Sequence, residues 1–577
     1  MSDNYIDSAD SGSNYSFGDK RLPANAPRSL FDLSHLNSLT VNNAGSLIPV
    51  CLIETVPNDS FEISESCLLR VLPQVVPLYS RQRLYFYAFY ARSCDLWKQA
   101  HAYYKRGYDG NFYGNKPKLT EANMADGYWT RKIQSEDLLD YLGLPIGYSP
   151  KELNDVGAIN ALPVFMYEKI YQGYFMEKNL YIHNRAWLPD DEADLRLNGD
   201  EVISNSYLEA EQSGIKLGQI HYRNYPKDYF TSCVPTPTRG TLPNLDFSFS
   251  GKNPVVKLAI NDPTLSGGLP LTAKAGDVLS LYSPTVNNGE KTDVVAFNRA
   301  KSVSLSASDG KYSHLYADLN SVNLISTITL DKLRQLSIAT EEVERMARTD
   351  GSYIDFGLTF FDVVCKNALD YRPILFGASY QSISFSEVLQ TSPTSGAPLG
   401  AYGGHGISVP SENGYLGKID CDDYGYIMIV ASIMPDVYYH QGLDKLWTKT
   451  VQKEEFLPNR AKMGLIPVLN KELYFSGNKE KDDDLFAYQN PFEEMRYKAS
   501  TIHGKIADSS NLSFFPYTQS RHFGETPTYS PEFFTADDVR KDYLAGGTAE
   551  SAYTCQIKFD IRAVRPLSYV GIPAQIV

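Results

Sequence analysis

The sequence predicts a mainly β protein, a single jelly roll with long loop insertions and a few helices. Of its 577 residues, 41 are Tyr and 12% are aromatic, while 40 Gly and 32 Pro are spread along the chain and only 21% are charged. Aromatic residues favour strands, whereas Gly and Pro favour turns. Strand patterns also occur at both ends of the chain and are separated by long excursions. This arrangement favours one sheet system, closed by distant segments, over several consecutive domains.

Five strands account for the prediction. Near the N-terminus we expect strands at residues 47–56, 67–76 and 84–90, and the last of these is so aromatic that both of its faces must be buried. In the last third, residues 424–434 form an apolar run typical of a buried strand. Residues 555–563 alternate apolar and polar side chains, which indicates a strand with one wet face.

Two helices are expected between these strands. In the first, at residues 163–178, Pro163 suits the first turn, and aromatic or aliphatic residues recur with helical spacing. We interpret its Tyr side chains as core packing, not as a platform for stacking bases. The second helix begins near Asp331, with Thr329 as the candidate N-cap, and ends near Gly351.

Two segments fall outside this scheme. Residues 1–30 are rich in Ser, Asn, Asp and Gly, which predicts an extended N-terminal arm before a domain at residues 31–577. Residues 241–313 are rich in Gly, Ser, Asn and Thr, with short alternating pieces at 255–260 and 278–282. They predict a β-rich insertion that has no strong core of its own.

Charge and cysteine content restrict the function classes. The chain carries 54 basic and 68 acidic residues, a net charge of −14, so it cannot hold nucleic acid by bulk attraction. Its seven cysteines lack C-x-x-C spacing, which indicates buried, reduced thiols. The N-terminus has no apolar signal segment, and no apolar run is long enough to span a bilayer. We therefore expect a soluble protein made inside a cell.

Catalytic signatures are missing from the sequence. It contains no phosphate-binding loop, zinc-protease helix, nucleophile elbow or dinucleotide fingerprint. None of its nine His residues stands at metal-ligand spacing from another, and the acidic run at 482–484 reads as a solvated loop because it lacks the alternation and Gly of a calcium loop. We therefore predict no catalytic, metal or cofactor site. Chance pairs among 68 carboxylates leave a glycosidase open but select no residues.

Basic residues gather in three places where they could contact phosphate, although each group is also ordinary for a solvated face. The groups are Lys20, Arg21 and Arg28 in the arm, Arg81 and Arg83 before the aromatic strand, and Lys558, Arg562 and Arg565 in the last strand.

Several stretches, taken in order, carry a family resemblance. They read PRSLFDLSH at 27–35, GSLIPV at 45–50, ETVPNDSF at 54–61, DLW at 95–97, ALPVFMYEKIYQGYF at 161–175, PTPTRG at 235–240, QGL at 441–443 with Trp447, VLNKELY at 468–474 and EMRYK at 494–498. These stretches resemble the major capsid protein of the Microviridae, small single-stranded DNA phages, and especially its gokushovirus-like members. Departures are Asn58 in place of a glycine, Val164 and Phe165 in place of polar residues, and an unmatched middle insertion.

This resemblance implies an eight-stranded viral jelly roll whose long loops form contacts between subunits. On the order of sixty copies, with pentamers as the assembly unit, would build a T=1 icosahedral shell in the bacterial host cytoplasm and become the virion capsid. The implied partners are a small basic DNA-packaging protein, a scaffolding protein, the single-stranded DNA genome and a host surface receptor. No cofactor or membrane insertion is implied. Lys20, Arg21 and Arg28 become the candidate contacts to DNA or to the packaging protein, and residues 241–313 become a candidate threefold protrusion for host attachment.

Two other classes of protein remain as alternatives. A lectin-like β-sandwich would bind sugars through exposed Tyr and Trp side chains and stay monomeric or form a small oligomer. A hydrolase on a β scaffold would lose its activity when one particular carboxylate is changed.

Overall fold

The computed structural model describes most of the chain in separate stretches. They are residues 27–97, 100–106, 115–121, 124–125, 127–180, 218–240, 257–260, 270–272, 280–282, 293–296, 315–318, 330–349, 353–364, 372–386, 389, 391, 403–408, 414–545 and 551–570. The chain forms two compact units, one made of Met1–Pro237 with Met346–Val577 and the other of Thr238–Arg345.

Ten antiparallel strands form the main sheet of the first unit. They are β1 (Ser29–Asp32), β2 (His35–Val41), β3 (Ile48–Thr55), β4 (Ser60–Val71), β5 (Gln82–Arg92), β11 (Ile374–Ser386), β12 (His405–Ser408), β13 (Tyr415–Asp420), β14 (Gly425–Pro435) and β17 (Tyr553–Arg565). Their order is β1-β17-β4-β12-β11-β5-β14-β3, with β2 also paired to β17 and β13 to β4. The first and last strands are neighbours, with Ser29 opposite Arg565. Distant segments therefore do close one sheet system.

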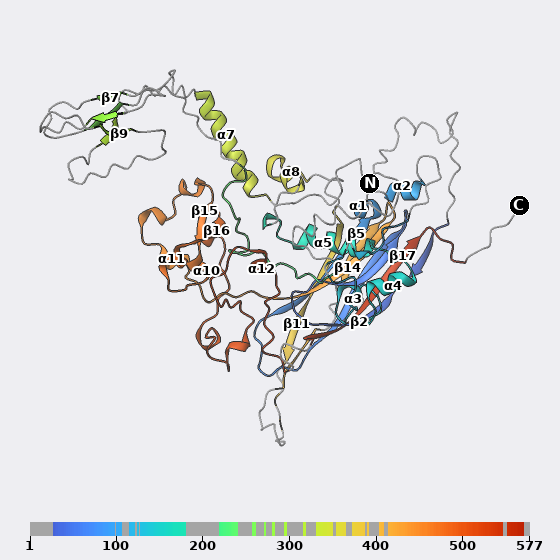
Figure 1. The fold of residues 1–577 in the computed structure, drawn as a ribbon. Helices are drawn as coiled ribbons and strands as arrows, with labels where there is room; N and C mark the ends of the chain where they lie inside the picture. Colours follow the sequence, from blue (N-terminus) through green and yellow to red (C-terminus); the bar gives the residue numbers. More distant parts are fainter. Residues whose placement is uncertain are drawn as a thin grey trace, which may run out of the picture. The chain divides into compact units, whose positions relative to one another are not determined.

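The sheet curls so that its β17–β4 part faces its β5–β14 part across a shared core (Figure 1). Phe61 and Phe559 from one part are fully buried in the same apolar cluster as Phe86 and Ile429 from the other. This curled antiparallel sheet, with few helices, is the predicted jelly roll.

The burial of individual strands follows their sequences. β17 alternates buried and exposed residues because only one of its faces meets the core, as predicted. β14 is buried at all its positions, and β5 at most, because a second apolar cluster covers their outer face. The strand predicted at 67–76 differs in its bounds: β4 begins at Ser60 and ends at Val71, shortly before Pro73, which cannot donate to a strand ladder.

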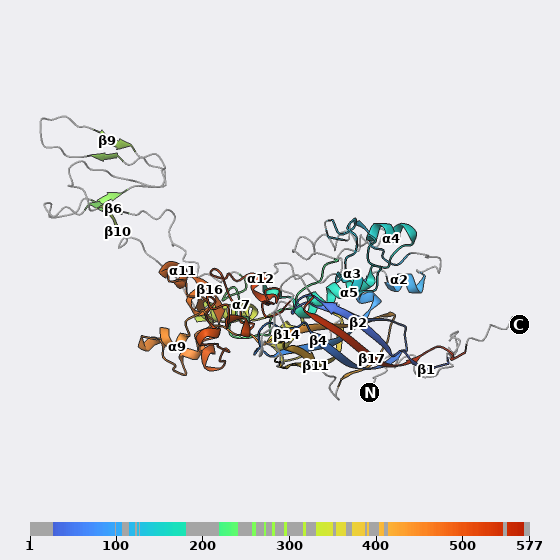
Figure 2. The same cartoon turned by 90° about the horizontal axis from the view of Figure 1, so that it is seen from below.

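Short helices and turns supply that outer cover. They are α1 (Ser93–Leu96), α2 (Ala100–Lys105), α3 (Leu138–Tyr141), α4 (Pro150–Val156), α5 (Leu162–Ile170) and the π-helical turn η2 (Tyr171–Phe175). Two further helical elements of this unit are η3 (Lys178–Leu180) and α8 (Tyr353–Phe361). Figure 2 shows α3, α4 and α5 together on one side of the strands. The helix predicted at 163–178 is confirmed as α5 and η2, although its last turn widens to π geometry.

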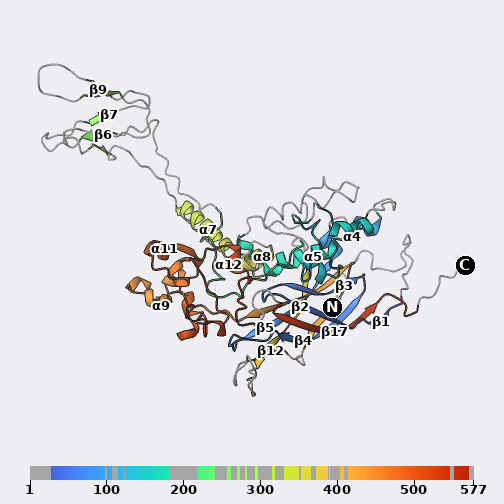
Figure 3. The same cartoon turned by 60° about the horizontal axis from the view of Figure 1, so that its bottom comes forward.

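The excursion between β14 and β17 has a small core of its own, shared with Tyr229, Phe230 and Cys233. Its elements are α9 (Lys445–Thr448), η6 (Gln452–Glu454), η7 (Arg460–Lys462), β15 (Ile466–Leu469), α10 (Asn470–Leu473), α11 (Lys479–Asp483), β16 (Leu485–Gln489), η8 (Glu493–Met495), η9 (Gly504–Ile506), η10 (Phe515–Tyr517) and α12 (Pro531–Phe534). Figure 3 shows this segment in orange and brown around α9, α11 and α12.

The solvated loop predicted at 482–484 is correct in that Asp483 and Asp484 are exposed, but it is wrong for Asp482, and the run begins inside helix α11. Asp482 is only 4% exposed, and its carboxylate accepts backbone N–H bonds from Ser476 and Gly477. These bonds fasten α11 to the turn that precedes it, so this carboxylate has a structural role in the local fold.

The second unit holds two small antiparallel sheets and most of helix α7 (Leu330–Ala347). In one sheet β6 (Lys257–Ile260) pairs with β10 (Leu315–Asp318) and with β7 (Pro270–Thr272), and in the other β8 (Ser280–Tyr282) pairs with β9 (Asp293–Ala296). Strands therefore occur at 257–260 and 280–282, within the two alternating pieces of the predicted β-rich insertion. The helix predicted near Asp331 is confirmed, but it ends at Ala347 and not near Gly351, while the proposed cap Thr329 lies outside the described residues. In the described part of the chain, no helix combines the length and apolar character needed to cross a membrane.

Candidate functional site

The basic residues of the arm are only partly within the described structure. Lys20 and Arg21 lie outside the described residues. Arg28 is exposed just before β1, and its guanidinium Nη2 donates a 2.9 Å hydrogen bond to the backbone carbonyl of Asn58. Asn58, which stands where the resemblance expects glycine, has a φ of 72°. Asn tolerates this left-handed conformation better than most residues, so the departure fits the same turn.

The basic residues predicted on the last strand lie among carboxylates. Lys558 pairs with Asp560 at 2.7 Å along the exposed face of β17. Arg562 lies opposite Asp32 of β1 and opposite Glu62 of β4 in the strand register. The exposed face of β17 is therefore electrostatically mixed and is a poor surface for a polyanion.

Two other predicted basic residues, Arg565 and Arg83, also have acidic partners. Arg565 holds the fully buried carboxylate of Asp59 with two hydrogen bonds, of 2.9 and 3.2 Å. Arg83 lies 3.6 Å from Asp436 at the start of the aromatic strand. Both arginines therefore have structural roles within the jelly roll.

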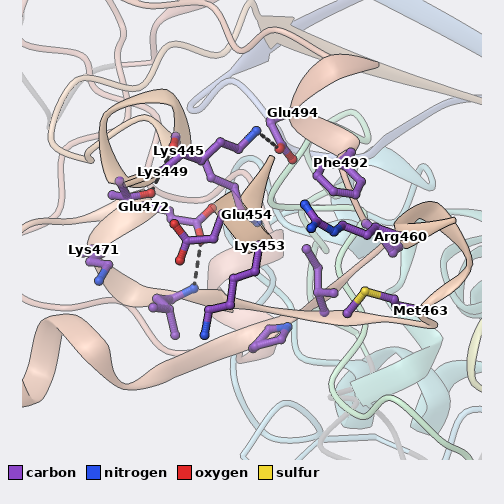
Figure 4. Close-up of a pocket in the computed structure, with 15 residues that line it drawn as sticks. Lys445, Lys449, Lys453, Glu454, Arg460, Met463, Lys471, Glu472, Phe492 and Glu494 are labelled. Carbon is purple, nitrogen blue, oxygen red and sulfur yellow. Dashed lines mark hydrogen bonds and ion pairs between the residues drawn. The ribbon is translucent and has the colours of Figure 1, made fainter. Parts of the chain in front are cut away.

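A more concentrated basic site lies in the excursion between β14 and β17. There a pocket of about 290 Å³ is lined by residues of 445–494, including the side chains drawn in Figure 4. Its cationic lining residues outnumber its carboxylates five to three. The cations are Lys445, Lys449, Lys453, Arg460 and Lys471, and the carboxylates are Glu454, Glu472 and Glu494.

Each of the three carboxylates of this pocket already has a partner within the protein. Lys449 lies 2.5 Å from the Glu494 carboxylate, and both side chains are largely buried. Glu454 accepts backbone N–H bonds from the turn before it, which lower its pKa. Burial raises the pKa of Glu472, whose carboxylate accepts a 2.9 Å hydrogen bond from the hydroxyl of Tyr229.

The excess charge of the pocket is therefore positive. Within the described structure, the side-chain ammonium groups of Lys445 and Lys453 have no hydrogen bond or ion pair, and the ring of Phe492 contributes an apolar wall. Such a pocket can hold an anionic group such as phosphate. Sequence reasoning missed it, although Lys445, Lys449 and Lys453 recur at intervals of four residues.

Two Tyr side chains of the first predicted helix, Tyr167 and Tyr171, pack into the core, while Tyr174 is 37% exposed. Tyr167 is fully buried, and its hydroxyl donates a 2.8 Å hydrogen bond to the backbone carbonyl of Leu47 in front of β3. Tyr171 stacks on the ring of His221 with centroids 4.0 Å apart. These two residues confirm the core-packing interpretation.

Together, the curled sheet, its paired chain ends and its long excursions define a protein of the jelly-roll class, which includes many viral shell subunits. The chain belongs to the phage capsid protein family described as "Capsid protein (F protein)", whose family model matches residues 21–575. The predicted resemblance to the major capsid protein of the Microviridae is thereby confirmed.

Individual relatives are similar over nearly their whole length. The chain is 25% identical to "Capsid protein VP1" of Chlamydia phage 1, over 95% of both chains. It is 26% identical to "Capsid protein VP1" of Bdellovibrio phage phiMH2K over 92% of both, and 25% identical to that of Spiroplasma virus 4 over 95% of both. The family is one of structural proteins, not of enzymes, so the hydrolase alternative is wrong. A lectin-like β-sandwich would not explain why the chain matches the capsid family over residues 21–575.

Proposed function

We propose that this chain builds a T=1 icosahedral shell around a single-stranded DNA genome. The observation that carries the proposal is the capsid-family match across residues 21–575, which includes the strands of the jelly roll as well as its excursions. Identical copies related by closed symmetry repeat the same contacts around each axis, which lets one chain form a complete shell. Pentamers are the proposed assembly unit.

Exposed apolar side chains support burial by a neighbouring copy. Leu446, Trp447 and Met463 are 69%, 74% and 68% exposed, and all three lie in the excursion between β14 and β17. Trp is among the residues most enriched at the energetic centres of protein interfaces. We therefore propose that the surface around Trp447 contacts a second copy of this chain.

The N-terminal arm is the proposed contact to the packaged genome. Lys20, Arg21 and Arg28 would face DNA phosphates or a small basic packaging protein. The net charge of −14 supports a basic partner, because a strongly acidic shell protein cannot neutralise a genome by itself. A scaffolding protein is proposed to guide assembly in the bacterial host cytoplasm.

Residues 241–313 are proposed to form a surface protrusion at the threefold axes that binds a host receptor. Their composition, rich in Gly, Ser, Asn and Thr, supports a surface role more than a core role.

Sedimentation of the protein from a native phage lysate, followed by nuclease challenge of the fast fraction, tests this function. We expect particles far larger than one chain that protect single-stranded DNA. A monomer or dimer with no protected DNA would overturn the proposal. The native lysate is the right material because assembly is proposed to need the scaffolding protein.

A further inference from the structure

Three segments of the first unit bring a thiol, an imidazole and a carboxylate together. Cys94 lies in α1, His101 in α2, and Asp423 in the turn between β13 and β14. Their ligand atoms all lie within 4.8 Å of one another, and His101 Nε2 is 3.5 Å from Asp423 Oδ2. Cys94 and His101 are seven positions apart, and Asp423 lies more than 300 positions further along the chain. This spacing matches no recognisable metal-binding sequence motif.

Contacts other than those of the three side chains hold these segments in place. The backbone N–H of Ser93 donates a 2.7 Å hydrogen bond to the carbonyl of Tyr424, which joins α1 to the turn. The ring of Tyr104 in α2 stacks on the ring of Tyr424, with centroids 4.0 Å apart and planes at 5°. The three potential ligands therefore stand on a scaffold that is already assembled.

The carboxylate of Asp423 is also oriented by its surroundings. Its Oδ1 accepts a 2.7 Å hydrogen bond from the backbone N–H of Tyr424, which leaves Oδ2 on the side of His101. The hydroxyl of Tyr90 donates a 3.0 Å hydrogen bond to the backbone carbonyl of Asp423. In metal sites, a carboxylate that ligates through one oxygen typically accepts a hydrogen bond at its other oxygen, as Asp423 Oδ1 does from the N–H of Tyr424.

We propose that Cys94, His101 and Asp423 bind a divalent transition metal of the Zn²⁺ class. A mixed sulfur, nitrogen and oxygen set suits Zn²⁺ or Co²⁺, whereas Ca²⁺ and Mg²⁺ prefer oxygen ligands alone. Tetrahedral bonds to such a metal place the ligand atoms roughly 3.3–3.6 Å apart, so the set must contract by about 1 Å. His101 can supply this movement because its side chain is 74% exposed.

Metal binding at this site releases a proton. A cysteine ligates a metal of this class as its thiolate. The metal forms a bond to sulfur while the S–H bond breaks, and the proton leaves to solvent. Three protein ligands leave a fourth position for water or for a group from a neighbouring molecule. This proposal does not depend on shell assembly.

Co²⁺ is the probe that tests the site, because cobalt bound to a thiolate gives a near-ultraviolet charge-transfer band. The full-length chain is freed of metal with a chelator and titrated with Co²⁺, and then with Zn²⁺ as a competitor. We expect the band to saturate at one Co²⁺ per chain and to disappear on addition of Zn²⁺. No band, or a band that Zn²⁺ leaves unchanged, would overturn the proposal.

Variants assign the band to these residues. Cys94→Ser should abolish it, and His101→Ala should weaken Co²⁺ binding at least tenfold. Asp422→Asn, which alters the neighbouring carboxylate, is the matched control and should retain the band. Retention of the band in Cys94→Ser would show that another thiol binds the metal and would overturn the assignment.

His101→Ala should fold like the wild-type chain, because the His101 side chain is exposed and contributes little to packing. A loss of metal binding in this variant would therefore not result from misfolding. Zn²⁺ should raise the melting temperature of the wild-type chain but not that of His101→Ala. Equal shifts in the two proteins would mean that His101 is no ligand and that it only pairs with Asp423.

Discussion

Replacing Glu65 with Gln should remove a pH-dependent destabilisation of the jelly roll. Glu65 lies in β4 and is 3% exposed. One carboxylate oxygen accepts a 2.9 Å hydrogen bond from the hydroxyl of Ser379, and the other accepts a 3.1 Å bond from the amide of Gln381. Burial nevertheless dominates over these two bonds and raises the pKa of Glu65 from 4.5 to about 7.

The sign of the effect follows from proton binding in the two states. Between pH 4.5 and 7 the folded chain holds the Glu65 proton more tightly than the unfolded chain does. The stabilisation from this group is therefore complete below pH 4.5 and is lost as the pH rises through 7. A shift of this size corresponds to about 3 kcal/mol of unfolding free energy, at 1.36 kcal/mol for each pH unit.

Urea unfolding of the full-length chain at several pH values between 4 and 8 measures this effect. The unfolding free energy of Glu65→Gln minus that of wild type should rise by about 3 kcal/mol over this range, whatever its value at pH 4. Glu62→Gln, an exposed position on the same strand, is the matched control, and its difference from wild type should stay constant. A difference for Glu65→Gln that does not vary with pH would refute the reasoning.

Three further substitutions test the packing and the assembly surface. A Cβ at Gly377 would lie 1.7 Å from a backbone oxygen of β13, so Gly377→Ala should lower the free energy of unfolding in urea by at least about 3 kcal/mol. Gly157→Ala is the control: its Cβ meets nothing within 4 Å, and the free energy of unfolding should change by less than about 0.5 kcal/mol. Asp59→Asn should lower the free energy of unfolding by about 3 kcal/mol or more in the same assay, because it leaves the guanidinium of Arg565 without its buried carboxylate partner. A loss below about 1 kcal/mol would contradict this structural role. Trp447→Lys should leave stability within about 0.5 kcal/mol but reduce the yield of sedimenting shells, and a wild-type yield would place the subunit contact elsewhere.

The strands with the clearest sequence patterns were the most predictable parts of the fold. β17 alternates residue by residue because one of its faces packs against the core and the other meets solvent. β14 is apolar throughout because both of its faces are covered. β4 was misplaced by several residues because the polar side chains in its first half fit the solvent face of a strand as well as they fit a loop.

The candidate sites could not be predicted in the same way. The basic residues of β17 stand out in the sequence, but carboxylates from β1 and β4 lie opposite them in the register. The pocket lined by Lys445 and Lys453 depends on residues spread over 445–494, which come together only when this excursion folds on itself. The group formed by Cys94, His101 and Asp423 joins residues that are more than 300 positions apart in the chain.

The sequence by itself determined the fold class, the main strands and helices, and the family, because hydrophobic periodicity and ordered short motifs are local properties of a chain. Only the tertiary structure decided which charges are paired, which carboxylates are buried and which ligand atoms meet. Pairing and burial depend on strand register and on long-range closure, and the same local sequence fits more than one register until the whole sheet is assembled. Glu65 illustrates this distinction: its strand pattern is visible in the sequence, but its raised pKa arises from burial in the assembled sheet, which outweighs the two hydrogen bonds from β11.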